Sequence, residues 1–514
     1  MKLSADPDTQ LSGASPMPWV VERLGTTLVA TCDAPLCQWG PGTQKIFAAL
    51  LDAVSGGPET DRIVLCGQTA FAADVQFDGA GRVRQADILE LVTALAQSKT
   101  PVVAAISGLA SGAGLEAALA CASRVAGPDA RFEMPEAALG LLPINGGVTA
   151  LAALVGLNAA ADMMALGDVH SGASAAAIGL VDRCESGDLI QAVLAAPPPR
   201  LPDPACATPD RRGDWDADLV NLGKRLRHRA PGSVAHRALT QALELGLQHR
   251  AMRATRAIRQ VAERCAASDQ ALALAYAWAA RAEDARIRDR SSLDAALRWT
   301  LLREAIHTLD AGGSPDLIDR ALVGFGFVDA PLAAADRIGL GVILDRCADT
   351  DGAWRIYSPT VDLMSGEGRL GVASGLGWYR YPRGDGVPQV DPSLDRILGD
   401  SALAQRLQRR PFTQDEVVAR CLAAMVNGAF SLLGSGAAPS ALALDGAWNR
   451  MGFPAWRGGL LFHADRWGLQ TVISTVQAAN ASRPTLGPPA DLLVDLAARG
   501  VAAAPWPPES ARSQ

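Results

Sequence analysis

PVVAAISGLASGAGLE, residues 101–116, decides the fold of the first part of the chain. The apolar run Val102–Ile106 is typical of a buried strand, and Gly108 allows a tight turn directly after it. The small residues 112–114 then let the backbone approach a ligand closely at the start of a helix. We therefore expect a buried strand, a glycine turn and a helix, in that order.

The alternation of short apolar runs and helical stretches extends over residues 15–195. A second buried strand is expected at 63–67, with helices at 89–96 and 115–121. Strand and helix in turn imply an α/β layer architecture. The proline-rich segment 196–204 cannot be helical and indicates a semi-rigid linker after this domain.

Two carboxylates stand beside apolar sequence in this domain. Glu116 lies in the first turn of the expected helix, whose unpaired N–H groups and partial positive charge suit an oxyanion hole. Glu136 lies in FEMPEAALGLLPINGG, residues 132–147, between a proline and an apolar run. Burial of such a pair could divide acid and base work between the two groups. From spacing alone, a helix-end charge and a surface glutamate remain the plainer alternative.

The run from 101 to 182 resembles the crotonase (enoyl-CoA hydratase/isomerase) family. The matching positions are Gly108, Gly112, Gly114, Glu116, Pro135, Glu136, Leu139, Gly140, Pro143, Gly146, Gly147 and Gly179 to Asp182. The resemblance implies the ββα spiral fold of that family and an acyl-CoA thioester substrate. It also implies that Glu116 and Glu136 act on a bound water, and that Glu136 carries the proton in double-bond isomerisation.

The same resemblance implies an oxyanion hole made of two backbone N–H groups, those of Phe71 and Ala113. This chain departs from the family around the first donor, where residues 69–75 read TAFAADV. If Asp74 matches the family's aspartate, Phe71 takes the donor position and Ala72 replaces a glycine. The substrate-binding positions implied by the resemblance are Ala70, Ala72, Asp74, Gly112, Gly114 and Gly140.

The remainder of the chain reads as all-helical. Residues 215–290 form expected linker helices, with arginines that either face solvent or contribute to an anionic coenzyme A site. A repeat follows: Asp319 and Asp336 recur as Asp445 and Asp465, at offsets of 126 and 129 residues. The repeat predicts two packed helical half-domains, at 291–400 and 401–505.

The last two blocks resemble the C-terminal helical domain of 3-hydroxyacyl-CoA dehydrogenases, in the arrangement of type-1 multifunctional β-oxidation enzymes. The resemblance lies in residues 322–340, 368–381 and 451–459, the last reading MGFPAWRGG. Only residues 284–290 stand where that family has its NAD-binding domain. A dinucleotide domain needs a far longer βαβ unit, so we expect no NAD cofactor and no dehydrogenase activity. The helical block then has a structural role or shapes the acyl channel.

The composition argues against a nucleic-acid-binding, membrane-spanning, secreted or metal-binding protein. The net charge of −7 gives no nucleic-acid signature. No apolar run long enough to span a membrane stands out, and the first residues lack a signal peptide's pattern. Nine scattered cysteines without a CxxC pair indicate reduced thiols and no metal site, as in a cytoplasmic protein. No feature fixes assembly beyond a monomer or low-order oligomer.

The sequence thus predicts an enoyl-CoA hydratase of fatty acid β-oxidation that needs no cofactor. A close alternative is Δ3-Δ2-enoyl-CoA isomerase, which needs chiefly Glu136. A third is a non-catalytic acyl-CoA-binding or scaffold protein.

Overall fold

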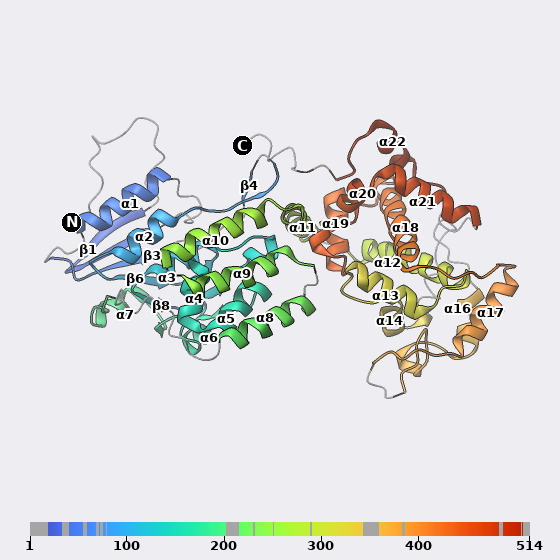
Figure 1. Ribbon diagram of the computed structural model, residues 1–514, viewed down its shortest axis with the longest axis horizontal. Coiled ribbons are helices and arrows are strands. Elements are labelled where there is room, and N and C mark those ends of the chain that lie inside the picture. The colour runs from blue at the N-terminus through green and yellow to red at the C-terminus, as the bar shows by residue number, and fades with distance from the viewer. Residues whose placement is uncertain are drawn as a thin grey trace. The chain divides into compact units, whose positions relative to one another are not determined.

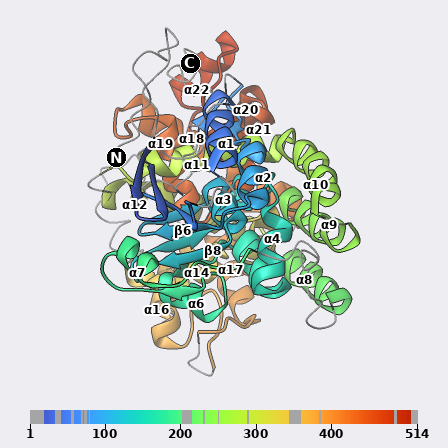
Figure 2. The same cartoon turned by 90° about the vertical axis from the view of Figure 1, so that its left-hand side faces the viewer.

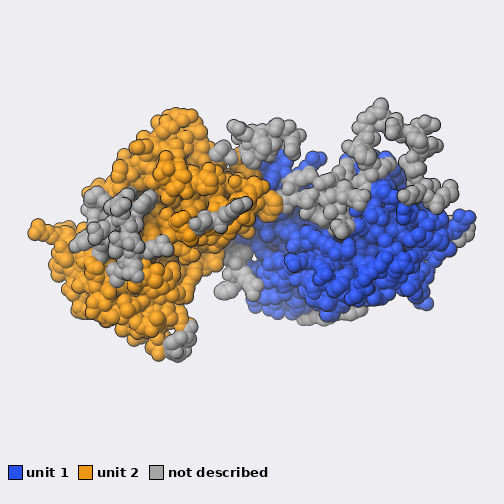
Figure 3. Space-filling view, turned by 180° about the vertical axis from the view of Figure 1, so that it is seen from behind, with its two compact units in different colours: residues 1–275, 509–514 blue, residues 276–508 orange. Residues whose placement is uncertain are grey.

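The structure is a computed structural model of the 514-residue chain. It describes residues 19–32, 41–54, 59–67, 71, 76–78, 80–201, 215–229, 232–249, 251–287, 290–342, 359–382, 386–482, 487–504 and 506. These residues form two compact units, one ending at residue 275 and the other beginning at residue 276 (Figure 3). We call them unit 1 and unit 2 and describe each by itself.

Unit 1 is built on a six-stranded sheet in the order β1-β2-β3-β6-β8-β11, in which β1 and β2 are antiparallel and all other neighbours are parallel (Figure 1). Its strands are β1 (Trp19–Leu24), β2 (Thr27–Cys32), β3 (Arg62–Cys66), β6 (Val102–Ile106), β8 (Ser123–Ala126) and β11 (Arg183–Cys184). The expected strands at 63–67 and 102–106 are therefore confirmed as β3 and β6.

Alternate residues of these strands supply two separate cores. Ile63 and Leu65 of β3 belong to the large core of unit 1, whereas Val64 belongs to a smaller core on the other face. Helix α7 (Leu189–Ala195) covers that smaller core, and α1 (Pro41–Val54) and α2 (Leu89–Gln97) lie on the opposite side (Figure 2). Side chains of a strand alternate between faces, so a sheet covered on both sides reads as a continuous apolar run.

The remaining elements of unit 1 before residue 200 are short strands and helices outside the six-stranded sheet. They are the strands β4 (Gln76–Phe77), β5 (Val83–Arg84), β7 (Leu109–Ser111), β9 (Arg131–Glu133) and β10 (His170–Ser171), the helices α3 (Ala113–Ala120), α4 (Gly147–Val155), α5 (Leu157–Ala161) and α6 (Gly172–Ala177), and the short helices η3 (Glu136–Leu139) and η4 (Asp162–Leu166). Strands β10, β9 and β7 form a second sheet. Helices α2 and α3 confirm the expected ones.

The expected linker is helical, but it does not form a separate body. Its helices are α8 (Trp215–Arg229), α9 (Val234–Gln248), α10 (Ala251–Ala266) and α11 (Asp269–Asp284). Leu239, Leu243 and Ile258 lie in the large core of unit 1, because α8 to α10 carry one apolar stripe each toward it. The boundary between the two compact units falls inside α11, after residue 275. The domain bounds expected from the sequence stay predictions.

Unit 2 is helical around α18, which contacts α12, α13, α20, α21 and α22. Its helices are α12 (Ser291–Asp310), α13 (Pro315–Phe325), α14 (Pro331–Ile338), α16 (Pro359–Gly366), α17 (Leu394–Ala404), α18 (Gln414–Gly434), α19 (Ala441–Arg450), α20 (Leu460–Trp467), α21 (Leu469–Ser482) and α22 (Asp491–Arg499), with short helices η6 (Val372–Ser374) and η7 (Ala455–Arg457). Helix α18 lies in the second expected half-domain and packs against α12 and α13 of the first. Both half-domains belong to one compact unit.

Helix α18 has the length and hydropathy of a membrane span, which the sequence analysis did not single out. It is the one described helix that is long and apolar enough to cross a membrane, and 67% of its apolar window is buried inside the structure. That burial is what the central helix of a packed bundle requires.

The four aspartates of the repeat have matching tasks in unit 2. The Asp319 carboxylate accepts hydrogen bonds from the N–H groups of Leu332 and Ala333, and Asp445 accepts them in the same way from Leu461 and Phe462. Each pair of N–H groups lies in the first turn of a helix, where donors lack partners within the helix. Asp319 and Asp445 therefore cap the next helix of their copy.

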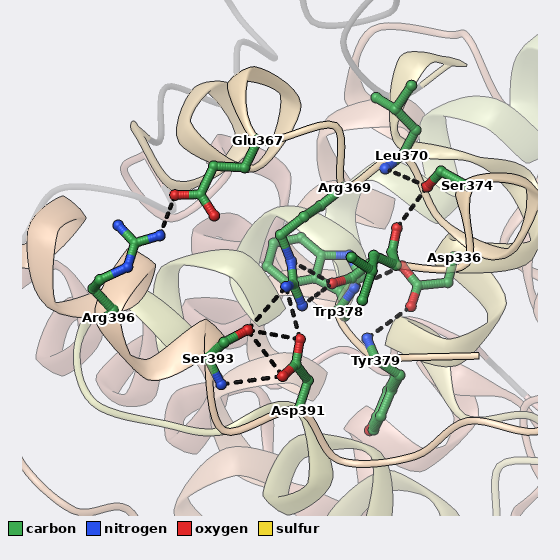
Figure 4. A network of polar contacts seen from close by, with 12 residues as sticks. Asp336, Glu367, Arg369, Leu370, Ser374, Trp378, Tyr379, Asp391, Ser393 and Arg396 are labelled. Atoms are coloured by element: carbon green, nitrogen blue, oxygen red, sulfur yellow. Dashed lines mark hydrogen bonds and ion pairs between the residues drawn. The ribbon is translucent and has the colours of Figure 1, made fainter. Parts of the chain in front are cut away.

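The second aspartate of each copy holds a loop instead. Asp336 accepts hydrogen bonds from the N–H groups of Trp378 and Tyr379, at 2.9 and 3.0 Å (Figure 4). Buried Arg369 ties the same loop to Asp391 by an ion pair of 2.7 Å. These hydrogen bonds and this ion pair hold residues 368–381 in place as a loop.

Candidate active site

A cleft in unit 1 collects both glutamates singled out from the sequence. It has an empty volume of about 520 Å³, including space open to solvent. Its walls come from β5 and the segment after it, the β7–α3 turn, and the stretch 135–145: Val83, Arg84, Gln85, Ala86, Ser111, Gly112, Ala113, Glu116, Pro135, Glu136, Leu139, Leu141, Ile144 and Asn145. An apolar wall with a few convergent polar groups is typical of a small-molecule site.

The glycine turn brings the backbone of Phe71 against the start of α3. The Ser111 N–H donates to the Phe71 carbonyl oxygen at 3.1 Å. A Cβ added to Gly114 would lie 1.7 Å from that oxygen, so only glycine permits this approach. Gly112 has φ +52, which L side chains rarely adopt.

Ala113 is the first residue of α3, so its N–H has no acceptor inside the helix. Because the Phe71 backbone lies against the same turn, the structure brings both expected oxyanion donors into one region. Glu133 fixes the turn from the other side: its carbonyl oxygen accepts from the Gly112 N–H at 3.2 Å. Its carboxylate also accepts from the Ser111 hydroxyl at 2.9 Å.

Glu116 is 2% exposed and accepts hydrogen bonds on both carboxylate oxygens. Oε1 accepts from the N–H groups of Asn145 and Gly147, both at 2.8 Å. Oε2 accepts from the side-chain amide of Asn145 at 2.7 Å. Burial raises the pKa of Glu116, while these three donors and the charge of Arg259 lower it.

Asn145 contacts Glu116 directly, and the sequence analysis did not single it out. Its side-chain amide also donates to the Ala86 carbonyl oxygen at 3.1 Å, and its Oδ1 accepts from the Ile88 N–H at 3.0 Å. All polar atoms of its side chain are therefore used to hold it against Glu116. The only signal in the sequence was its place beside Gly146 and Gly147, which the family pattern contains.

Gly147 is required for the same arrangement. A Cβ at this position would lie 2.7 Å from Cγ and 2.8 Å from Oε1 of Glu116. Such distances are too short for any real Cβ, so a larger residue would displace the glutamate.

Glu136 begins the short helix η3 and has a different environment. Its Oε2 is buried and has no hydrogen-bond partner among the described residues. Burial raises the pKa of Glu136 to about 8, and the charges of Glu116 and Glu133 raise it further. At neutral pH the group is therefore mostly protonated.

The two carboxyl groups are thus suited to different tasks. Glu116 accepts three hydrogen bonds from N–H donors, whereas the buried Oε2 of Glu136 has no partner among the described residues and the pKa of Glu136 is raised. Environments that separate the pKa values of two carboxyl groups are how one site carries out acid and base chemistry together. The arrangement can hold a water on one carboxylate and deliver a proton from the other.

The substrate-binding positions expected from the resemblance fall into three groups. Gly112 lines the cleft. Gly114 and Gly140 have packing tasks: Gly114 lies against Phe71, and a Cβ on Gly140 would lie 2.7 Å from Cα of Ala271. Ala70, Ala72 and Asp74 lie outside the described residues.

The rest of the described chain offers a further cavity but no candidate metal site. The described ranges contain no group of three or more His, Cys, Asp or Glu side chains arranged to hold a metal ion. A cavity in unit 2 is mainly apolar and is lined in part by Phe327, Ile338 and Trp448. His463 packs against the rings of Phe325 and Phe453, and burial lowers its pKa to about 4.

Comparison with known families agrees with both resemblances. Residues 47–193 match the family enoyl-CoA hydratase/isomerase, and residues 296–381 match the family 3-hydroxyacyl-CoA dehydrogenase, C-terminal domain. The first match contains every described residue of the cleft wall.

The human peroxisomal bifunctional enzyme is 31% identical over 215 residues, which are 38% of this chain and 30% of that protein. The peroxisomal fatty acid beta-oxidation multifunctional protein AIM1 of Arabidopsis thaliana is 47% identical over 95 residues, which are 18% of this chain and 13% of that protein. The chain therefore spans less than a third of the length of these relatives. A solved structure of DspI from Pseudomonas aeruginosa is 26% identical, with a TM-score of 0.32, and covers 46% of this chain and 91% of that one.

Proposed function

We propose that this chain, which contains an enoyl-CoA hydratase/isomerase domain and a 3-hydroxyacyl-CoA dehydrogenase C-terminal domain, is an enoyl-CoA hydratase of fatty acid β-oxidation. It adds water reversibly across the double bond of a trans-2-enoyl-CoA. The observation that carries the proposal is the pair of glutamates in one cleft. Glu116 accepts hydrogen bonds from N–H donors, and Oε2 of Glu136 has no partner in the part of the chain that the structure describes.

The reaction assigns a task to each group. The thioester carbonyl accepts hydrogen bonds from the N–H groups of Ala113 and Phe71, which stabilise the enolate as it forms. Glu116 orients a water and takes one of its protons while the water oxygen bonds to the β-carbon. Glu136 gives its proton to the α-carbon, so the product carries hydrogen at the α-carbon and hydroxyl at the β-carbon. A return of the proton from Glu116 to Glu136, by way of solvent, restores the site.

A second candidate is Δ3-Δ2-enoyl-CoA isomerisation. The unpartnered Oε2 of Glu136 favours it, because moving a proton between two carbons needs one free carboxyl group and no held water. The third candidate is a protein that binds acyl-CoA without turnover.

We further propose that the chain needs no NAD and lacks dehydrogenase activity. The support is the short stretch 284–290, which joins α11 to α12 and is far below the length of a dinucleotide domain. The unit 2 block is then a structural partner, and acyl-CoA is the substrate.

A cytoplasmic location and a monomeric or low-order oligomeric state also stand as proposals. The six cysteines in the described part of the chain are free thiols, which suits a reducing compartment. The relatives are named peroxisomal, so imaging a tagged chain would decide between the compartments.

The test is hydration of short- and medium-chain trans-2-enoyl-CoA by purified protein, followed by loss of the ultraviolet absorbance of the enoyl thioester. Glu136→Gln keeps the shape of the side chain and serves beside the wild type. We expect turnover by the wild type and a loss of roughly 100-fold or more in the variant. Folded wild-type protein that binds acyl-CoA in calorimetry without converting it would establish the binding protein instead.

A further inference from the structure

Helix α10 lies outside the segment that matches the hydratase/isomerase family, yet one of its side chains reaches the surroundings of the cleft. The Arg259 guanidinium makes a two-pronged ion pair with the Asp87 carboxylate. Nη1 lies 3.0 Å from Oδ1, and Nη2 contacts Oδ2. A bidentate arginine–carboxylate pair fixes direction as well as distance.

Asp87 stands between the two residues that hold Asn145. The carbonyl oxygen of Ala86 accepts from the Asn145 amide, and the N–H of Ile88 donates to Asn145 Oδ1. Asp87 itself is anchored further, because its carbonyl oxygen accepts from Gln44 at 2.9 Å. Whatever fixes Asp87 therefore fixes both backbone groups that orient the Asn145 side chain.

Asn145 in turn supplies two of the three hydrogen bonds to Glu116. A continuous series of contacts thus runs from α10 to the carboxylate: Arg259 to Asp87, the 86–88 backbone to Asn145, and Asn145 to Glu116. We propose that Arg259 is a positioning residue for Glu116, acting through Asp87 and Asn145. This inference rests on the proposed function, since it deepens the role of one residue of that site.

The charges around Arg259 are consistent with this role. Asp87, Glu263 and Glu116 are the acidic groups whose charges act on Arg259, and Asp87 has the largest effect. Arg259 also lowers the pKa of Glu116, so it favours the ionised form that holds the water. The pair is partly exposed, with 24% of the Arg259 side chain accessible, so its effect is modest.

The test compares Arg259→Ala, Arg259→Lys, Asp87→Ala and the double alanine variant in the full chain. The matched control is Arg256→Ala, because Arg256 is an exposed arginine on the same helix. We expect Arg259→Ala to lower kcat/KM for hydration roughly fivefold, mostly in kcat, and Arg259→Lys to recover part of it. The kcat/KM of the double variant should be no lower than that of the less active single variant, because both substitutions break the same contact.

A second readout separates positioning from loss of fold and does not depend on turnover. The Glu116 carboxyl is titrated by carbon-13 NMR, with its signal assigned from Glu116→Gln. In Arg259→Ala we expect the pKa of Glu116 to move upward, and in Arg256→Ala to stay in place. Suppose the wild type is active, and Arg259→Ala and Arg256→Ala have the same kcat/KM and the same Glu116 pKa. That result would overturn the inference and leave the proposed function standing. An inactive wild type would remove the proposed function, and the titration alone would then decide whether Arg259 acts on Glu116.

Discussion

At the scale of single residues, Glu136 shows how an ordinary side chain becomes an acid at neutral pH. Its pKa is raised to about 8 by burial and by the charges of Glu116 and Glu133. The proposed hydration needs Glu136 protonated, so its activity falls as pH rises through this pKa. It also needs Glu116 ionised, so activity falls again when Glu116 is protonated at lower pH. The sequence predicted the pair of glutamates and, through the family resemblance, Glu136 as the proton carrier, but it did not show the burial and the charges that raise the pKa of Glu136.

The alkaline limb of kcat/KM for hydration should therefore lie near pH 8, because kcat/KM reports the ionisation of the free enzyme. Glu133→Gln removes one of the charges that raise the pKa of Glu136, so the limb should move to lower pH. Initial rates measured across the alkaline limb, in wild type and variant, give the position of the limb in each. Ser111→Ala serves as the control, since it removes the hydroxyl that contacts Glu133 and leaves that charge in place. A limb that stays fixed in Glu133→Gln would contradict the assignment to Glu136.

At the scale of elements, the strands and helices of unit 1 follow closely from the apolar pattern. Strand β6 has the residues expected, and α2 differs from the expected helix by one residue. The parts that could not be predicted depend on contacts distant in sequence. Asn145 receives its partners from Ala86 and Ile88, which lie 59 and 57 residues away, and no local pattern reports such a pairing.

Gly147 at the start of α4 offers a test at this scale. Gly147→Ala places a methyl group against Glu116 Cγ and Oε1, so the carboxylate must move. A displacement of that size in a catalytic group costs roughly 100-fold in kcat. Gly42→Ala in α1 is the matched control, because nothing lies within 4 Å of the added Cβ. Equal rates for the two alanine variants would argue against a role for Glu116 in holding water.

At the scale of the whole molecule, the helical content followed from the sequence, whereas the packing partners of the helices did not. The linker helices were expected to form a block of their own at 215–290, but α8 to α10 complete the core of unit 1. The apolar stripe of each helix predicts that one face is buried, but it does not predict which part of the protein covers that face. The repeat predicted two half-domains, and the capping aspartates confirm the repeat, but α18 packs against helices of both copies, which belong to one unit.

The residues of the cleft all belong to unit 1, so damage to the core of unit 2 should leave hydration intact. Asp445→Ala removes the acceptor for the N–H groups of Leu461 and Phe462 and for the Tyr276 hydroxyl. Buried donors left without partners cost about 1–3 kcal/mol each, so the unfolding transition of unit 2 should move to lower temperature. Calorimetry measures that transition, and heat inactivation of hydration reports unit 1.

Asp495→Ala is the control for that experiment, because Asp495 makes only an exposed pair with Arg499 on α22. Such pairs contribute less than about 1 kcal/mol. Loss of hydration in Asp445→Ala at temperatures where the wild type is active would refute the independence of the site from unit 2.

The measurement that tests the central claim most directly is a comparison of hydration and isomerisation in Glu116→Gln and Glu136→Gln. Each variant is assayed with a trans-2-enoyl-CoA for hydration and a cis-3-enoyl-CoA for isomerisation. If Glu116 holds the water and Glu136 carries the proton to carbon, Glu136→Gln loses both activities, while Glu116→Gln loses hydration by roughly 100-fold and keeps most isomerisation. Hydration at the wild-type rate in folded Glu136→Gln would contradict this division of tasks and the function proposed from it.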